Sequence, residues 1–193
     1  MLADHQILKL CQEQKMISPF TDRSHSTNED GDKIVSYGLS SYGYDIRLGS
    51  KVKYLDNTGQ TLSPHYIATE WEECYVGWDD YFTIRPHSFI LGESVERFKI
   101  PRDILCICFG KSTYARVGIS INITPLEPEW EGVLTIEIAN NSSNPVNVYY
   151  NEGIAQLIFL QANELCTTSY ADKGGKYQNQ TGVTTAKLVG ESK

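Results

Sequence analysis

Residues 106–137 read CICFGKSTYARVGISINITPLEPEWEGVLTIE, two apolar segments that flank a stretch with charged and hydroxyl side chains. An apolar strand is predicted from Ile104 to Phe109, and it ends at Gly110 with Lys-Ser-Thr directly after it. A second strand is predicted from Val133 to Ala139 and carries one acidic residue, Glu137. The stretch therefore places a cation and a hydroxyl group directly after one predicted strand, and a carboxylate on the next.

Short apolar runs separated by turn residues continue along most of the chain. Such runs lie at residues 51–55, 79–86, 88–98, 103–109, 117–123, 133–140, 146–150 and 154–162. Many short strands at this spacing predict an all-β fold, a distorted β-barrel or jelly roll, and not alternating βαβ units. One amphipathic helix of about ten residues is predicted near the N-terminus, with Asp4 as its N-cap.

The length of 193 residues suits a single domain that spans residues 1–193. We find no internal repeat and no linker in the sequence. Residues 21–34 are polar and rich in turn formers, so composition predicts a mobile loop there.

The net charge of −7 argues against a general nucleic-acid or membrane-surface binder, because such a protein needs a basic face. No apolar run approaches the roughly 20 residues of a membrane-spanning helix. The five cysteines form no CxxC pair and no signal peptide is recognised, which favours reduced thiols and a cytoplasmic location. Cys106 and Cys108 share one strand face and are interpreted as small buried groups.

The segment YDIRL alternates as a strand does, with Tyr44, Ile46 and Leu48 on one face and Asp45 and Arg47 on the other. Two charges on one strand face indicate an exposed surface or a mutual salt bridge. A contact with a second subunit is the third interpretation, and the sequence leaves all three open.

The junction Gly110-Lys111-Ser112-Thr113 lies where a strand meets a single predicted helical turn, STYAR. A helix start offers unpaired N–H groups to an anion, and Lys111 and Arg116 add positive charge on either side. The spacing is not that of a Walker A motif. By pattern alone, an ordinary surface junction and an anion site both remain open.

Glu137 lies among β-branched and small residues on its own strand face, where glutamate is disfavoured. Its carboxylate therefore reaches solvent or faces a cavity, and in a cavity desolvation would raise its pKa toward values useful for proton transfer. The adjacent segment PLEPEWEG, residues 125–132, is interpreted as an acidic surface loop or as a cavity wall that contains Trp130.

Zinc-dependent nucleobase deaminases need an HxE motif followed by PCxxC. None of the four histidines is followed two residues later by Glu, and none of the seven prolines precedes a cysteine. This excludes the zinc-type chemistry. A nucleophile elbow for serine hydrolase chemistry is also missing from the sequence.

Residues 171–193 are glycine-rich and polar. They are interpreted either as a disordered terminus or as a C-terminal flap that orders over a ligand, with Gly174 and Gly175 as its hinge.

Five motifs, in this order, closely resemble the dCTP deaminase family, which is related to the trimeric dUTPases. They are SYGLSSYGYDIRLG at 36–49, GKSTYARVGI at 110–119, PLEPEWEG at 125–132, TIEIAN at 135–140 and GKYQNQTGV at 175–183. The resemblance covers nearly the whole chain. It implies a dUTPase-like homotrimer with active sites shared between subunits, and zinc-independent hydrolysis of dCTP to dUTP and ammonia, which supplies dUTP for dUMP and dTTP synthesis.

The resemblance also implies a role for each matching residue. Glu137 would be the general base and acid, while Ser112 and Arg116 would organise the attacking water and the glutamate. Lys111 stands at the position of a phosphate-binding arginine. The other implied nucleotide contacts are Thr113, Tyr114, Ala115, Thr135, Ile136, Gln156, Tyr170, Lys176 and Gln180. Magnesium would be carried by the triphosphate and not by protein side chains.

Two departures from the family pattern lie in the loop from Thr124 to Trp130. The loop is shorter than in some relatives and has Pro125, and Glu127 replaces a common aspartate near the sugar. Family members that also hydrolyse dUTP to dUMP and diphosphate often have Phe at the position of Trp130, which favours deamination alone. The alternatives are a bifunctional deaminase–dUTPase and a non-catalytic nucleotide-binding regulator.

Overall fold

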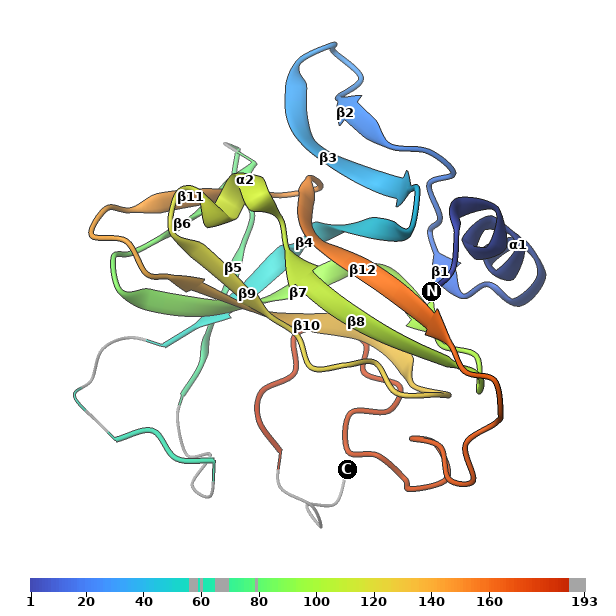
Figure 1. The fold of residues 1–193 in the computed structure, drawn as a ribbon. Helices are drawn as coiled ribbons and strands as arrows, with labels where there is room; N and C mark the ends of the chain where they lie inside the picture. Colours follow the sequence, from blue (N-terminus) through green and yellow to red (C-terminus); the bar gives the residue numbers. More distant parts are fainter. Residues whose placement is uncertain (56–58, 60, 65–69, 79, 188–193) are drawn as a thin grey trace.

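The computed structural model describes residues 1–55, 59, 61–64, 70–78 and 80–187, and most of its regular structure is β (Figure 1). The helices are α1 (Asp4–Gln14) and α2 (Ser112–Ala115). The strands are β1 (Ile17–Ser18), β2 (His25–Thr27), β3 (Lys33–Ser40), β4 (Gly43–Tyr54), β5 (Glu72–Tyr75), β6 (Tyr81–Ile84), β7 (Ser88–Lys99), β8 (Ile104–Gly110), β9 (Ile119–Asn122), β10 (Glu131–Asn140), β11 (Val146–Tyr149) and β12 (Gly153–Gln161). The prediction of an all-β fold with a short N-terminal helix is confirmed.

The strands pair antiparallel in one large sheet that curls into a half-barrel (Figure 1). Along the main path the order is β2-β3-β4-β7-β10-β9, and β12 joins β4 to β8. Strand β4 pairs with β3, β5, β7 and β12 along its length, so it connects the two halves of the curl. Strands β6 and β11 form a separate two-stranded sheet.

The core follows from strand alternation. In β10 the residues Leu134, Ile136 and Ile138 are at most 3% exposed, and those between them are half-buried on the other face. On β4, Tyr44, Ile46 and Leu48, which were predicted to share one strand face, are all fully buried. One face of each strand therefore fills the interior of the curl, which leaves the other face of β10 free to form a cavity.

A bulge in β7 interrupts its pairing with β10, because the partner of Val133 is Arg97 and the partner of Thr135 is Glu93. At the bulge, the hydroxyl of buried Ser94 provides hydrogen bonds to backbone groups of β7 and β10. Its hydroxyl donates to the carbonyl of Glu96 at 2.6 Å and accepts the N–H of Leu134 at 2.9 Å. The bulge directs Glu96 away from β10 and toward β4.

Asp45 and Arg47 do not pair with each other, and neither lies on an open surface. Arg47 donates to fully buried Glu96 from Nε at 2.8 Å and from its backbone N–H at 3.0 Å. Asp45 instead accepts a bond from Lys111. The two charges are thus held by two different segments, an arrangement that the sequence did not distinguish from a surface pair.

Two local predictions were wrong. Helix α1 begins one residue earlier than predicted, with Ala3 as N-cap, because the Gln6 side chain accepts the Ala3 N–H and Asp4 already lies in the first turn. Residues 21–34 are not simply a loop: β2 pairs with β3, and the rings of His25 and Tyr37 stack at 5.5 Å. Cross-strand pairing gives this polar segment the structure that its composition did not indicate.

All five cysteines are free. Cys106 is fully buried, and burial raises the pKa of Cys108 to about 12, so both behave as neutral thiols. Within the part of the chain that the structure describes, no helix is long and apolar enough to cross a bilayer.

We expect Glu96→Gln to lower the free energy of unfolding by about 3–5 kcal/mol, because Arg47 would keep its charge in a buried place without a counter-charge. Urea denaturation at mildly alkaline pH measures the change. The control is Glu131→Gln, which removes a half-exposed pair with Arg97 and should cost about 1 kcal/mol or less. If both variants lost the same free energy of unfolding, the buried Arg47–Glu96 pair would not be the stronger of the two contacts.

Candidate active site

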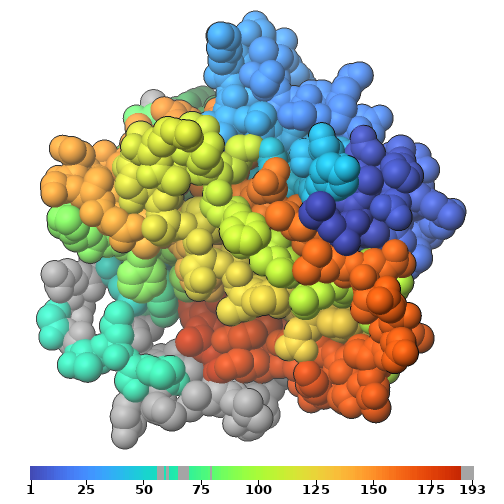
Figure 2. Space-filling view, viewed as in Figure 1, coloured from blue at the N-terminus to red at the C-terminus, as the bar shows by residue number. Residues whose placement is uncertain are grey.

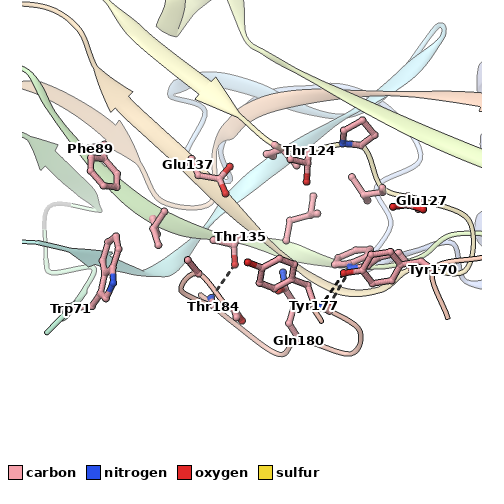
Figure 3. A pocket seen from close by; sticks show the side chains of 17 residues that line it. Trp71, Phe89, Thr124, Glu127, Thr135, Glu137, Tyr170, Tyr177, Gln180 and Thr184 are labelled. Atoms are coloured by element: carbon pink, nitrogen blue, oxygen red, sulfur yellow. Dashed lines mark hydrogen bonds between the residues drawn. The ribbon is translucent and has the colours of Figure 1, made fainter. Parts of the chain in front are cut away.

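Glu137 points from β10 into a cavity of about 380 Å³ (Figure 3). The residue lies between Leu91 of β7 and Asn122 of β9, on the face opposite the core side chains. Its Oε2 is buried and has no hydrogen-bond partner among the described residues. Burial raises the pKa of the Glu137 carboxyl above its ordinary value, and only its own backbone N–H opposes the shift. The sequence left open whether the Glu137 side chain reaches solvent or faces a cavity. In the structure it faces a cavity.

The cavity is elongated, and Glu137 and Thr135 lie near its middle (Figure 3). At one end Trp71 and Phe89 meet edge to face, with ring centroids 6.0 Å apart. At the other end Tyr170 lines the cavity together with residues of the β9–β10 connection and the C-terminal segment. The aromatic side chains at both ends of the cavity can pack against a flat apolar group, and the Glu137 carboxylate lies between them.

The segment 125–132 is both an acidic loop and a cavity wall. Trp130 is 6% exposed, lines the cavity, and donates its Nε1–H to the carbonyl of Tyr177 at 3.1 Å. Glu127 also lines the cavity and pairs with Lys173 at 2.9 Å. Its neighbour Glu129 turns away and binds Arg102 at 2.6 Å.

The described part of the C-terminal segment, up to residue 187, lies against the start of β10. The backbone of Gln180 accepts the N–H of Val133 at 2.9 Å, and its side-chain Nε2 donates back to the Val133 carbonyl at 2.6 Å. The N–H of Thr184 donates to Thr135 Oγ1 at 3.0 Å. In Figure 2 this red segment packs directly beneath the yellow segment that contains the β9–β10 connection. The tail therefore closes one side of the cavity that holds Glu137.

Gly174 and Gly175 have different roles at the start of this segment. Gly174 has a φ of +60°, which favours glycine, while Gly175 packs directly on the Tyr170 ring. Tyr170 in turn accepts the backbone N–H of Tyr177 at 3.0 Å. Lys176 lies outside the cavity and donates to the carbonyl of Lys187 at 2.6 Å. The flap predicted over 171–193 is thus described to residue 187, and 188–193 lie outside the described residues.

A second group of the predicted residues lies at the β8–α2 junction, outside this cavity. Helix α2 is the single turn that the sequence predicted. Ser112, Thr113, Ala115 and Arg116 are exposed, and Arg116 Nη1 donates to the carbonyl of Ser112 at 3.0 Å. The chain therefore presents a hydroxyl and a guanidinium to solvent, outside the cavity that Glu137 faces.

Three predicted nucleotide contacts lie elsewhere. Ile136 is fully buried in the core, so only its backbone is available on the cavity side of β10. Tyr114 is 4% exposed, and its hydroxyl accepts the N–H of Tyr149 at 3.1 Å. Gln156 lies half-buried on β12, opposite Phe109 of β8. Of the predicted residues, Thr135, Glu137, Tyr170 and Gln180 share one cavity, and the others do not line it.

Lys111 is held within the chain. Its ammonium donates to Asp45 Oδ2, to the carbonyl of Ser36 at 2.8 Å and to the hydroxyl of Ser36 at 3.2 Å. The resemblance assigns this residue to the phosphates, and that assignment stays a prediction.

Sequence reasoning missed several cavity residues. Trp71 and Phe89 are far apart in sequence, and no periodicity links them. Tyr177 and Thr184 were inside or beside the GKYQNQTGV motif but were not singled out. The motif was the available signal for Tyr177, whereas the Trp71–Phe89 contact depends on tertiary structure alone.

Comparison with known proteins gives consistent results. A protein-family model described as dCTP deaminase-like matches residues 1–162. The chain is 48% identical over 191 residues to a dCTP deaminase of Helicobacter acinonychis (strain Sheeba), with 97% of each chain covered. It is 48% identical over 184 residues to a dCTP deaminase of Paraburkholderia xenovorans (strain LB400), covering 94% of this chain and 96% of the relative.

Among solved structures, the chain is similar to a 2′-deoxycytidine 5′-triphosphate deaminase from Agrobacterium tumefaciens. The TM-score is 0.58 at 17% identity, and the match covers 82% of this chain and 46% of that one. At this identity the likeness shows the fold.

We expect Gly175→Ala to loosen the C-terminal segment, because the new Cβ would lie 2.0 Å from the Tyr170 ring. Overpacking of this kind costs about 1–3 kcal/mol, so tryptic cleavage at Lys173 or Lys176 should accelerate roughly tenfold. Gly77→Ala is the control, since its Cβ would meet nothing within 4 Å. Unchanged cleavage in Gly175→Ala would show that the segment is not held by this contact.

Proposed function

The chain belongs to the dCTP deaminase-like family, and from this premise we propose that it hydrolyses dCTP to dUTP and ammonia without zinc. Two kinds of observation support the proposal. Relatives named dCTP deaminase align over nearly the full chain, and the residue that would carry the chemistry faces a cavity. The product dUTP would feed dUMP and dTTP synthesis.

The single observation that carries the proposal is the environment of Glu137. Its Oε2 is buried without a partner among the described residues, and desolvation raises the pKa of the carboxyl. A carboxylate with a raised pKa is a stronger base, so it accepts a proton more readily than an exposed glutamate does. That property suits a group that must act first as a base and then as an acid.

In the proposed reaction, Glu137 removes a proton from water while the water oxygen bonds to C4 of the cytosine. The carboxyl passes this proton to N3, which gives a tetrahedral intermediate. A second proton moves from the new hydroxyl by way of Glu137 to the amino nitrogen. The C4–N bond then breaks, ammonia leaves, and the C4 carbonyl of uracil remains.

The cavity suits a pyrimidine base in two respects. Its aromatic and apolar lining can hold a flat ring, and Thr135 beside Glu137 offers polar atoms at the ring edge. Cytosine and uracil differ at position 4 by an amino group against a carbonyl. A cavity that pairs the amino group would leave a buried polar atom unpaired with uracil, which discriminates strongly.

We further propose a homotrimer in which a neighbouring subunit supplies Ser112 and Arg116 to the cavity that contains Glu137. Supporting this, the chain's own Ser112 and Arg116 are exposed and lie outside that cavity. The outward face of β8 and β12 is also largely apolar. Its apolar members are Leu105, Ile107, Phe109, Ile158 and Leu160, beside the polar Gln156, and Phe109 is 55% exposed. A second copy would bury these side chains.

Because the chain carries a net negative charge, the triphosphate would have to be bound by a local group of positively charged residues. Arg116 and Lys176 would contribute cations, and Lys111 adds positive charge near the β8–α2 junction. Gln156, Tyr170 and Gln180 would contact the nucleotide. Magnesium would arrive bound to the triphosphate oxygens, since it prefers phosphate and water ligands.

A combined deaminase–dUTPase is the second candidate, and Trp130, where such enzymes often have Phe, favours deamination alone. A non-catalytic regulator would not need a desolvated carboxyl such as Glu137. The free thiols and the nucleotide substrate both suit the cytoplasm as the site of action.

We expect Glu137→Gln to lower kcat by roughly a thousandfold while dCTP still binds, because the amide cannot relay protons. Ammonia release is measured with dCTP, magnesium and a chelator that strips zinc. Glu131→Gln, on the same strand but outside the cavity, is the control. Full activity of Glu137→Gln would refute the mechanism, and diphosphate with dUMP from the wild type would establish the bifunctional alternative.

Mixing two inactive variants tests the shared site. If Glu137 and Arg116 come from different subunits, coexpressed Glu137→Gln and Arg116→Ala chains rebuild some intact sites. Half of the subunits supply the glutamate and half of their neighbours supply the arginine, so about one quarter of wild-type activity should return. No recovery, with mixed oligomers present, would place both residues in one subunit's site.

A further inference from the structure

The uncharged middle of the C-terminal segment lies beside a carboxylate of the sheet. Residues 177–186 contain no charged side chain. A Cβ added to Gly182 would lie 3.0 Å from Oε2 of Glu93 on β7, so the backbone approaches this carboxylate without an intervening side chain. The N–H of the next residue, Val183, donates to the carboxylate, and Val183 is 7% exposed. A buried part of the backbone therefore binds a charged acceptor, which is a stronger bond than one between neutral groups.

The other oxygen of Glu93 lies beside β4. A Cβ added to Gly49 would lie 2.6 Å from the Glu93 Cγ and 3.3 Å from its Oε1, so the side chain packs directly against the β4 backbone. Burial raises the pKa of Glu93, whereas the charge of Lys51 on β4 and the Val183 N–H oppose the rise. Lys51 itself binds Glu73 of β5 at 3.0 Å. Glu93 thus bridges β4 and the C-terminal segment, with one carboxylate oxygen beside each.

Strand pairing places Glu93 next to the wall of the cavity. Glu93 lies opposite Thr135 in the β7–β10 ladder, where the bulge ends. Thr135 lines the cavity, and its Oγ1 accepts the N–H of Thr184 at 3.0 Å (Figure 3). Two paired residues of the sheet therefore bind consecutive residues of the tail, and Thr184 and Ala186 of that tail line the cavity that contains Glu137.

We propose that Glu93 is a positioning residue for the proposed reaction: its carboxylate binds the backbone at residues 182–183 and so keeps Thr184 and Ala186 at the wall of the dCTP site. The inference rests on the proposed function, because it concerns the part of the tail that lines the cavity. Glu93 lies outside the five motifs that indicate the family, so this role follows from the fold and not from the resemblance.

The position of Glu93 determines which kinetic constant should change. Glu93 is not one of the described residues that line the cavity, so it acts through the tail. A nucleotide that needs the closed tail binds with an affinity reduced by the fraction of molecules in which the tail is closed. At saturating nucleotide the tail is closed in every molecule, and the chemistry at Glu137 proceeds as before. Removing the Glu93 carboxylate should therefore raise Kd and KM and leave kcat nearly unchanged.

Hydrogen–deuterium exchange of the nucleotide-free protein tests the contact itself. In Glu93→Ala we expect the amides of residues 182–184 to exchange about tenfold faster, because the segment loses a charge-assisted bond. Glu93→Gln keeps an acceptor oxygen and should restore most of the protection. Glu73→Gln is the control, since Glu73 pairs with Lys51 and Lys53 on the neighbouring strand and should leave this exchange unchanged. Unchanged exchange in Glu93→Ala, or equal acceleration in the peptides of β12, would overturn the proposal.

Binding of dCTP gives the second measurement, taken in the Glu137→Gln background so that turnover does not interfere. Adding Glu93→Ala should raise the Kd about fivefold or more. With Glu137 intact, Glu93→Ala should raise KM by a similar factor and keep kcat within about twofold, and Glu93→Gln should return KM toward the wild-type value. An unchanged Kd, or a large fall in kcat at unchanged KM, would overturn the proposal.

The outcomes also separate this proposal from the proposed function. If the wild type neither binds nor deaminates dCTP, the proposed function fails. Exchange in the nucleotide-free protein then still decides the positioning role: faster exchange confined to the tail in Glu93→Ala would support it, and unchanged exchange would overturn it.

Discussion

The alternation of β10 is the constraint on which the arrangement of the site depends. Successive side chains of a strand point to opposite faces, so the packing of Leu134, Ile136 and Ile138 in the core obliges Thr135 and Glu137 to face the cavity. A shift of one residue in the register would bury the carboxylate in the core and expose the isoleucines. The stability of the core therefore maintains the position of the candidate catalytic group.

This placement is energetically unfavourable for the charged form of Glu137. Its Oε2 is removed from water without a hydrogen-bond partner among the described residues, and desolvation raises the pKa of the carboxyl. Elsewhere the chain compensates its buried charges carefully: Arg47 binds Glu96, and Lys111 binds Asp45. An isolated buried carboxyl in such a structure is typical of a site where charge must move.

The C-terminal segment extends the site beyond the sheet. Bonds from Gln180 and Thr184 to β10 place the tail beside Glu137, and the Trp130 indole donates to the Tyr177 carbonyl from the other side. Because the tail and the β9–β10 connection share these contacts, a change in either would alter the same cavity. The order of the tail and the shape of the candidate binding site are therefore linked.

Features that depend on local geometry and on motif order could be predicted from the residues alone. Strand periodicity predicted the all-β fold and the shared face of Tyr44, Ile46 and Leu48. The segment STYAR was expected to form a single helical turn, and the motifs indicated the family. Four features became visible in the folded chain: Lys111 binds Asp45, Trp71 contacts Phe89, β2 within residues 21–34 pairs with β3, and Ser112 and Arg116 lie apart from the cavity of their own chain. The physical reason is that periodicity determines which face a side chain occupies, whereas its partner depends on strand register and chain topology, which bring together residues far apart in sequence.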